Sequence, residues 1–314
     1  MDDSLVLPRQ SLNPTAAPWT RPRWSWPGRY RKPGGGRILI TGCSSGIGRA
    51  TALELAARGM TVFAGVRRDR DGHDLLRAAP AADRQRLHPM QLDVTIPEGL
   101  ETVRDRLAAT GDLHALVNNA GIGVPGPLAG IDPEEFRRVF DVNLFGTLTM
   151  IRLFLPLLLP DGRIINMGSG FGKVAPPYQG SYAASKYALE GLSETLRQEL
   201  QPGGVQVSLI APGVVRTPYW EKQERAFRAG AATMNAQQRA AWFDDWERRN
   251  QRHLRYAQSR LYPSPERVAR VVARALTVRR PAARYPVGPD SRAGALGRRF
   301  LPDWLMHRIV AWLY

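Results

Sequence analysis

The hydrophobic positions between residues 37 and 290 fall into short apolar runs separated by longer amphipathic stretches. The short runs have the length and composition of buried strands and cover residues 37–41, 61–66, 87–94, 114–118, 163–167 and 205–211. Apolar positions with helical spacing lie between them, at residues 46–58, 98–109, 133–159 and 182–200. This alternation predicts an α/β fold in which a single doubly wound parallel sheet carries helices on both faces.

The alternation of strands and helices stops after residue 213. Residues 218–262 contain no strand signal and many charged and aromatic side chains, which predicts a helical lid over a substrate site. A further helix is expected at residues 265–278 and a last strand at 285–288. Residues 291–314 are expected to form a basic amphipathic tail, and residues 1–36, rich in Pro, Arg, Trp and Gly, a disordered arm.

A glycine-rich turn follows the first predicted strand and opens the first predicted helix. Gly42 permits a tight turn, Gly46 lets the backbone approach a pyrophosphate, and Gly48 lets the helix pack close to the strand. The helix N-terminus then presents free N–H groups and a positive dipole end to the phosphates. A Rossmann-type dinucleotide site is therefore predicted on Gly42, Ser44, Ser45, Gly46, Ile47 and Gly48.

The end of the second predicted strand selects between the two nicotinamide cofactors. An NAD enzyme usually carries an acid at this point, which hydrogen-bonds the ribose 2′-hydroxyl. This chain has Arg67 and Arg68 there, and Asp69 comes only after them. An arginine pairs with a 2′-phosphate through charge-assisted hydrogen bonds, and Ser44 is a second donor for the same phosphate. NADP(H) is therefore predicted in preference to NAD(H), the alternative being that these arginines are solvated loop residues.

Tyr182 and Lys186 stand four residues apart on a predicted helix, which puts both side chains on one face. Ser169 follows the fifth strand, at the sheet edge where α/β folds bind ligands. Hydride transfer to a carbonyl leaves an alkoxide that must take up a proton, which a phenol can donate. A free tyrosine has a pKa of about 10, and a nearby lysine cation is expected to lower the pKa of Tyr182 towards neutral pH. Ser169 is expected to hold and polarise the substrate oxygen.

The spacing Thr-Gly-x-x-x-Gly-x-Gly and the Ser169, Tyr182 and Lys186 set resemble the short-chain dehydrogenase/reductase family over residues 37–290. The resemblance implies that Asn143 is a fourth catalytic residue, supporting a water chain to Lys186, and that Lys186 also binds the nicotinamide ribose. It implies further cofactor contacts from Asp93, Val94, Asn119, Ala120, Gly121, Pro212, Gly213, Val215 and Thr217. Family members associate through their two long helices, so a homodimer or homotetramer is expected.

The predicted lid holds a group of aromatic side chains: Tyr219, Trp220, Phe227, Trp242, Phe243 and Trp246. These side chains either line an apolar pocket or only pack the lid against the sheet. The glycine turn, Arg67 and the long insertion are similar to those of 17β-hydroxysteroid and retinol dehydrogenases. That similarity implies a hydrophobic small-molecule substrate, a steroid-, retinoid- or lipid-like alcohol or ketone.

The net charge of +16 is concentrated towards the two ends, and residues 251–314 hold 13 arginines against 3 acids. No nucleic-acid-binding motif accompanies this charge, so nucleic acid is not expected as a partner. In the tail, one helical face is expected to hold Leu301, Trp304, Leu305, Ile309 and Trp312, with Arg298, Arg299 and Arg308 on or beside the other. The pattern fits peripheral contact with a membrane, and equally packing on the subunit or on a partner copy.

Cys43 is the only cysteine, and the 5 histidines are scattered without a partner at ligand spacing. Neither a disulfide nor a metal site is predicted. The apolar stretch 151–160 is shorter than the ~20 residues that span a bilayer, and no signal peptide is recognised, so a cytoplasmic location is expected. The predicted function is NADP(H)-dependent interconversion of an alcohol and a ketone or aldehyde. A non-catalytic NADP(H)-binding sensor or scaffold is the alternative.

Overall fold

A computed structural model describes residues 35–259 and 261–314, so nearly all of the expected N-terminal arm lies outside the described residues. Within this part, seven parallel strands form one sheet in the order β3-β2-β1-β4-β5-β6-β7. The strands are β1 Arg37–Ile40, β2 Thr61–Val66, β3 Leu87–Gln91, β4 Leu113–Asn118, β5 Leu158–Met167, β6 Gln206–Pro212 and β7 Arg284–Val287. The predicted doubly wound α/β sheet is confirmed, with every expected strand present.

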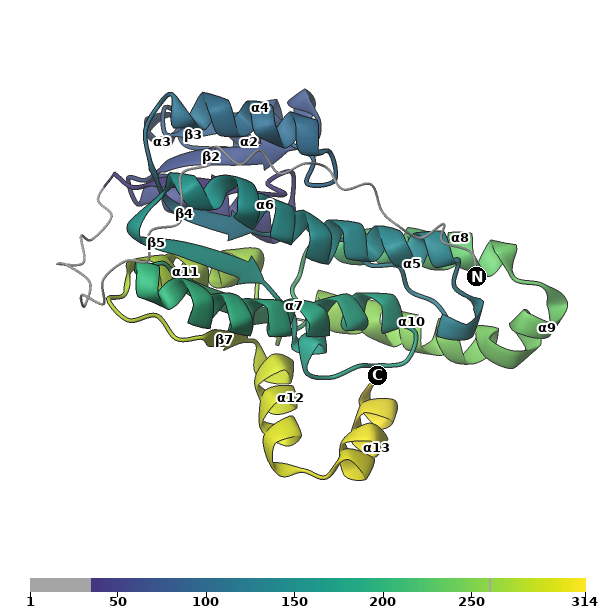
Figure 1. The fold of residues 1–314 in the computed structure, drawn as a ribbon. Coiled ribbons are helices and arrows are strands. Elements are labelled where there is room, and N and C mark those ends of the chain that lie inside the picture. Colours follow the sequence, from purple (N-terminus) through teal and green to yellow (C-terminus); the bar gives the residue numbers. More distant parts are fainter. Residues whose placement is uncertain (1–34, 260) are drawn as a thin grey trace, which may run out of the picture.

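Helices cover both faces of the sheet because alternate strand residues point in opposite directions (Figure 1). Ile40 and Val117 face a core shared with α1 Gly46–Ala57, α2 Asp69–Ala78 and α11 Pro265–Thr277. Leu39 and Leu116 face the opposite core, shared with α4 Pro97–Ala108, α6 Gly146–Phe154 and α7 Gly180–Leu200. The strands are buried on both faces, which explains why they are short continuous apolar runs in the sequence.

Strand β1 pairs with β2 on one side and with β4 on the other, so the strand order reverses at this point. In open α/β sheets, such a reversal opens a crevice at the carboxyl ends of the strands, where ligands bind. The glycine turn after β1 and the loop after β4 therefore meet at one edge of the sheet.

Two local expectations were wrong. The helix α2 was not predicted, because it is dense in charge and buries little more than Gly72 and Leu75. The stretch 133–159 is not one helix: it divides into α5 Pro133–Phe140, a π-helical turn Asp141–Phe145, α6 and a 3-10 turn Leu155–Leu157. Pro156 lies in that last turn, and β5 begins at Leu158, five residues earlier than expected, because Leu158 already pairs with Leu113.

The segment Pro133–Leu157, which contains α5 and α6, is long and apolar enough by length and composition to cross a membrane. No such segment was predicted from the sequence. In the structure, its second half packs against the sheet, where Met150, Ile151 and Phe154 are buried in the core. This burial accounts for the apolar character of α6 by packing inside the subunit.

Residues 219–258 are mostly helical, as expected, and contain α8 Tyr219–Thr233, the short α9 Ala236–Gln238, a π-helical turn Arg239–Phe243 and α10 Asp244–Gln258. The helices α8 and α10 are held together by a small core in which Phe227 and Trp246 contact one another, with ring centres 4.5 Å apart. Tyr178, from the loop before α7, stacks on Trp246 and so joins this core to the body of the subunit.

The last residues form two helices, α12 Pro289–Phe300 and α13 Asp303–Leu313, which project from the body and turn back towards it (Figure 1). Met306 and Val310 of α13 are buried against Val174. Trp304 and Trp312 are exposed and Arg308 lies between them on the same side, so the expected separation of Arg308 from the tryptophans was wrong. Gly297 of α12 determines which face of α13 is buried, because the absence of a side chain there lets the Met306 sulfur approach α12 closely.

Candidate active site

The glycine turn after β1 has the geometry that a bound phosphate requires. Gly42 and Gly46 have φ angles of +73° and +57°, in the left-handed region that favours glycine. A Cβ at Gly48 would lie 2.2 Å from the Gly42 carbonyl oxygen, so only glycine fits there. The turn leads directly into α1, whose first N–H groups face the carboxyl edge of the sheet. These backbone angles and close approaches are compatible with a dinucleotide at the turn, whose binding there stays a prediction.

Thr41 and Asn119 join this turn to the loop after β4. The Thr41 hydroxyl accepts hydrogen bonds from the backbone N–H groups of Asn119 and Ala120, at 3.0 and 2.9 Å. The Asn119 side-chain amide donates to the Thr41 and Gly42 carbonyl oxygens, at 2.9 and 3.1 Å. The role of Thr41 was missed in the sequence, although its position before the first glycine was the available signal.

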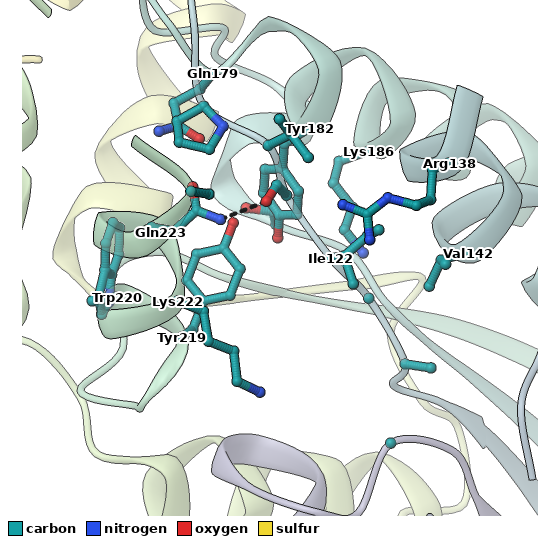
Figure 2. Close-up of a pocket in the computed structure, with 18 of the residues that line it drawn as sticks. Ile122, Arg138, Val142, Gln179, Tyr182, Lys186, Tyr219, Trp220, Lys222 and Gln223 are labelled. Atoms are coloured by element: carbon teal, nitrogen blue, oxygen red, sulfur yellow. Dashed lines mark hydrogen bonds between the residues drawn. The ribbon is translucent and has the colours of Figure 1, made fainter. Parts of the chain in front are cut away.

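Ser169, Tyr182 and Lys186 come together at the carboxyl edge of the sheet, where they line one cavity. Figure 2 shows Tyr182 and Lys186 there. Ser169 lies just past β5, and its hydroxyl is hydrogen-bonded to the Tyr182 phenol. Lys186, one turn further along α7, is buried and donates a 2.7 Å hydrogen bond to the Met167 carbonyl. Its Nζ lies 5.5 Å from the centre of the Tyr182 ring. The chain thus provides a hydroxyl, a phenol and an amine at one wall of a cavity.

The protonation of this pair differs from the sequence-based expectation. Burial raises the pKa of Tyr182, although the hydrogen bond from Ser169 acts in the opposite direction. Burial also lowers the pKa of Lys186 to about 8. The expected lowering of the Tyr182 pKa is therefore wrong for the protein alone, because burial of the phenol penalises its charged form. The phenol is protonated at neutral pH and can donate.

Asn143 is fully buried in the π-helical turn between α5 and α6. Its side-chain oxygen accepts from the Ile122 N–H, and its amide nitrogen donates to the Ile122 carbonyl and to the Ser185 hydroxyl, each at 2.9 Å. Ser185 in turn donates to the Tyr182 carbonyl. Asn143 therefore fixes the loop after β4 to the helix that carries Tyr182. It does not line the cavity, and its part in a water chain to Lys186 stays a prediction.

A single cavity of about 990 Å³ runs along the carboxyl edge of the sheet. Arg67, at the end of β2, lines it, and no acid among residues 35–259 and 261–314 forms an ion pair with its guanidinium. The neighbouring Arg68, in contrast, is paired with Asp71. The other predicted site residues that line this cavity are Gly42, Ser44, Ser45, Gly46, Ile47, Gly48, Asp93, Val94, Asn119, Ala120, Gly121, Ser169, Tyr182, Lys186, Pro212, Gly213, Val215 and Thr217.

Helix α8, in the segment predicted to be a lid, supplies the wall opposite Tyr182 (Figure 2). Tyr219 has its ring centre 6.1 Å from that of Tyr182, and Gln223 donates a 2.8 Å hydrogen bond to the Gly123 carbonyl. The aromatic lid residues divide between the two expected roles. Tyr219 and Trp220 line the cavity, Phe227 and Phe243 pack α8 against α10, and Trp246 does both.

Two features of the site were not predicted from the sequence. Gln223 is a polar side chain on the lid, and nothing in its spacing sets it apart. Phe171 lines the cavity and meets the Tyr182 ring edge-on, at 6.2 Å. Among the described residues, no group of three or more His, Cys, Asp or Glu side chains could hold a metal ion.

Known proteins share this arrangement along most of the chain. A profile described as short chain dehydrogenase matches residues 37–227. Mouse retinol dehydrogenase 5 is 35% identical over 290 residues, which cover 88% of this chain and 88% of that protein. Mouse 17-beta-hydroxysteroid dehydrogenase type 6 is 32% identical over 289 residues, covering 87% of each.

Solved structures agree with the sequence comparisons. A short chain dehydrogenase from Burkholderia cenocepacia, in complex with NADP, has a TM-score of 0.67 and 27% identity, covering 88% of this chain and 97% of its own. A short chain dehydrogenase/reductase from Burkholderia phymatum, in complex with NAD, has a TM-score of 0.70 and 27% identity, covering 86% and 94%. The two structures hold different nicotinamide cofactors, so the fold alone does not choose between them.

Proposed function

The chain belongs to the short-chain dehydrogenase family of oxidoreductases, and on that premise we propose that it interconverts an alcohol and a ketone or aldehyde on a hydrophobic substrate with NADP(H). The predicted resemblance to retinol and 17β-hydroxysteroid dehydrogenases is confirmed. The observation that carries the proposal is the meeting of Ser169, Tyr182 and Lys186 at one wall of the cavity that also contains the glycine turn.

The proposed proton chemistry belongs to three side chains. Bound NADP(H) supplies or takes up the hydride. Tyr182, protonated at neutral pH, donates its proton to the substrate oxygen during reduction and takes it back during oxidation. Ser169 holds that oxygen through its hydroxyl and so places it beside the phenol. Lys186 is held under the Tyr182 ring by the Met167 carbonyl, where its cation stabilises the phenolate form once the proton has left.

The preference for NADP(H) over NAD(H) rests on the end of β2. Arg67 is exposed, lines the cavity and has no acidic partner within the described residues, whereas Asp71 engages Arg68. An exposed guanidinium at this point fits a 2′-phosphate and leaves the 2′-hydroxyl of NAD without an acidic acceptor. Ser44, at the same end of the cavity, adds a hydroxyl donor for that phosphate.

The substrate class is proposed from the wall that faces Tyr182. Apolar side chains from four different segments line that part of the cavity: Val124, Pro127, Phe171, Tyr219, Trp246 and Met234. Pockets of this kind bind apolar molecules and orient them through a few polar groups. The names of the retinol and hydroxysteroid relatives support a steroid-, retinoid- or lipid-like alcohol or ketone. We propose that residues 218–262 act as the lid over this substrate.

The exposed helices and the charge distribution indicate how the enzyme assembles and where it lies. A homodimer or homotetramer would form through the long helices α5–α6 and α7, where Phe145 and Tyr187 are exposed. We place the chain in the cytoplasm, with a peripheral membrane contact through the basic residues at its C-terminal end.

The proposal is tested by measuring NADPH and NADH oxidation, and the reverse reduction, on a panel of steroid, retinoid, fatty aldehyde and small ketone substrates. We expect turnover on the large apolar compounds, with NADPH preferred. Tight NADPH binding without turnover on any compound would instead support the non-catalytic sensor, and turnover confined to small polar ketones would overturn the substrate class.

A further inference from the structure

The C-terminal hairpin, defined as α12 and α13 (residues 289–314), exposes large apolar side chains to an unusual degree. Phe300, Trp304 and Trp312 are 71%, 63% and 76% exposed. Folded proteins rarely leave several large aromatic side chains in water on one small element, and such a patch marks a binding surface. Leu296 and Leu313 are exposed on the same element.

Basic side chains are interleaved with these aromatic rings. Trp304, Arg308 and Trp312 follow one another at intervals of four residues, so they form one exposed line along α13. On α12, Arg292 and Arg299 flank Leu296 on the exposed face, and the Arg299 guanidinium lies 5.4 Å from the Phe300 ring centre. The acids of the hairpin are engaged elsewhere, because Asp290 accepts from the Val214 N–H and Asp303 pairs with Arg298.

The opposite side of the hairpin is fastened to the catalytic body. Ser291 donates a 2.7 Å hydrogen bond to the Ala211 carbonyl at the end of β6. Arg249 and Arg252 of the lid helix α10 donate to the Ala311 and Trp312 carbonyls, at 2.9 and 2.6 Å. These bonds complete the C-terminal end of α13 and tie it to the lid.

The hairpin also reaches the active site through its last residue. The Tyr314 ring meets Phe171 edge-on, with centres 5.5 Å apart, and Phe171 meets Tyr182 in the same manner at 6.2 Å. The exposed aromatic and basic surface is therefore separated from the catalytic tyrosine by only two ring contacts.

We propose that the exposed face of the C-terminal hairpin docks on an anionic lipid surface. The tryptophan rings enter the headgroup layer, and Arg292, Arg299 and Arg308 pair with lipid phosphates. This inference deepens the proposed function, since it places the lid and the substrate cavity against the bilayer from which an apolar substrate is drawn. The hairpin makes the membrane contact, and Tyr314, Arg249 and Arg252 connect the hairpin to the lid and the active site.

Charge argues for a lipid surface over a second copy of the chain. A two-fold contact between two hairpins would bring the arginines of one copy against those of the other, and like charges meeting at an interface oppose association. An anionic membrane offers the complementary charge and an apolar layer at the same time.

The test is flotation of the full-length protein with vesicles of phosphatidylcholine alone and of phosphatidylcholine with phosphatidylserine. We expect binding to the anionic vesicles, weakened by salt. The double variant Trp304→Ser/Trp312→Ser should bind at least about tenfold more weakly. The variant Arg299→Gln/Arg308→Gln should bind about 25-fold more weakly, because each of the two basic side chains near an anionic surface contributes about fivefold.

Two matched controls remove the same features elsewhere. Leu261→Ser removes a 70% exposed apolar side chain outside the hairpin, and Arg77→Gln/Arg106→Gln removes two exposed charges from α2 and α4. Both controls should bind vesicles as the wild type does. The proposal would be overturned if the controls lost vesicle binding as much as the hairpin variants, or if the tryptophan variant bound vesicles as the wild type does. It would also be overturned if the wild-type protein did not float with the vesicles, or if it self-associated through the hairpin.

Flotation needs no turnover, so this experiment is independent of the proposed reaction. A chain that binds anionic vesicles but oxidises no alcohol would contradict the proposed function and leave the docking surface standing. A protein that catalyses the reaction but does not float with the vesicles would contradict the docking surface and leave the proposed function standing. Circular dichroism of each variant checks that the fold is retained.

Discussion

The ammonium of Lys186 lies 5.5 Å from the centre of the Tyr182 ring and is held there by a 2.7 Å hydrogen bond to the Met167 carbonyl. Both groups are out of water, which shifts the pKa of Tyr182 upward and that of Lys186 down to about 8. At neutral pH the phenol is therefore protonated and Lys186 is still mainly a cation, so Tyr182 can donate a proton while Lys186 is charged to stabilise the phenolate.

The pH dependence of reduction should reflect Lys186. As pH rises through about 8, Lys186 loses its proton and can no longer stabilise the phenolate, so kcat/KM for carbonyl reduction should fall above that pH. Oxidation of the alcohol should instead rise with pH up to this limit, because Tyr182 must first lose a proton. Initial rates measured in both directions from pH 6 to 10 check this.

A Lys186→Arg variant is the matched control for this pH dependence. Its guanidinium stays charged over the whole range, so whatever residual activity it retains should lack the fall above about pH 8. A wild-type kcat/KM that stays constant to pH 10 would contradict this role of Lys186. A decrease above pH 8 that is unchanged in Lys186→Arg would assign that decrease to another group.

Replacing Gly48 with Ala should damage both cofactor binding and stability. The added Cβ would lie 2.2 Å from the Gly42 carbonyl oxygen and 2.4 Å from the Asn119 amide nitrogen, so the turn or α1 must move. We expect a loss of roughly 1–3 kcal/mol in the free energy of unfolding, measured by urea denaturation, and weaker NADPH binding by fluorescence titration.

The same substitution in α7 provides the control for the glycine turn. A Cβ at Gly191 meets no atom within 4 Å, so Gly191→Ala should leave NADPH binding unchanged and stabilise the helix by about 0.5–1 kcal/mol. Similar stability changes in the two variants would show that Gly48 is not under the predicted constraint.

Arg67→Asp should alter the choice of cofactor. Removing the guanidinium and adding a carboxylate at the end of β2 should weaken NADPH binding by about tenfold to a hundredfold and affect NADH much less. Arg77→Asp makes the same charge change at the exposed far end of α2, where no effect is expected. Dissociation constants for both cofactors decide the matter, and equal losses for NADPH and NADH would refute the role of Arg67.

Features that depend on residues close together in the chain were predicted correctly from the sequence. The apolar runs predicted the strands, and the four-residue spacing of Tyr182 and Lys186 predicted their shared face, because strand and helix periods repeat over short distances. The Thr41–Asn119 bonds and the Phe171–Tyr314 contact could not be predicted in this way, since they join residues 78 and 143 positions apart.

The protonation of Tyr182 could not be predicted from the sequence either. The shift of the Tyr182 pKa depends on how deeply the folded chain buries the phenol, and no local pattern reports that depth. The buried face of α13 likewise depends on Gly297 of α12, which accepts Met306, so the apolar positions of α13 alone did not identify which of its residues are buried.

The most direct test of the account is the turnover of Tyr182→Phe beside its NADPH binding. Phenylalanine keeps the ring contacts with Phe171 and Tyr219 and removes only the hydroxyl. We predict that kcat falls by about 10²–10⁴ while the dissociation constant for NADPH stays near the wild-type value. Turnover by Tyr182→Phe at the wild-type rate would contradict the proposal that this hydroxyl carries the proton.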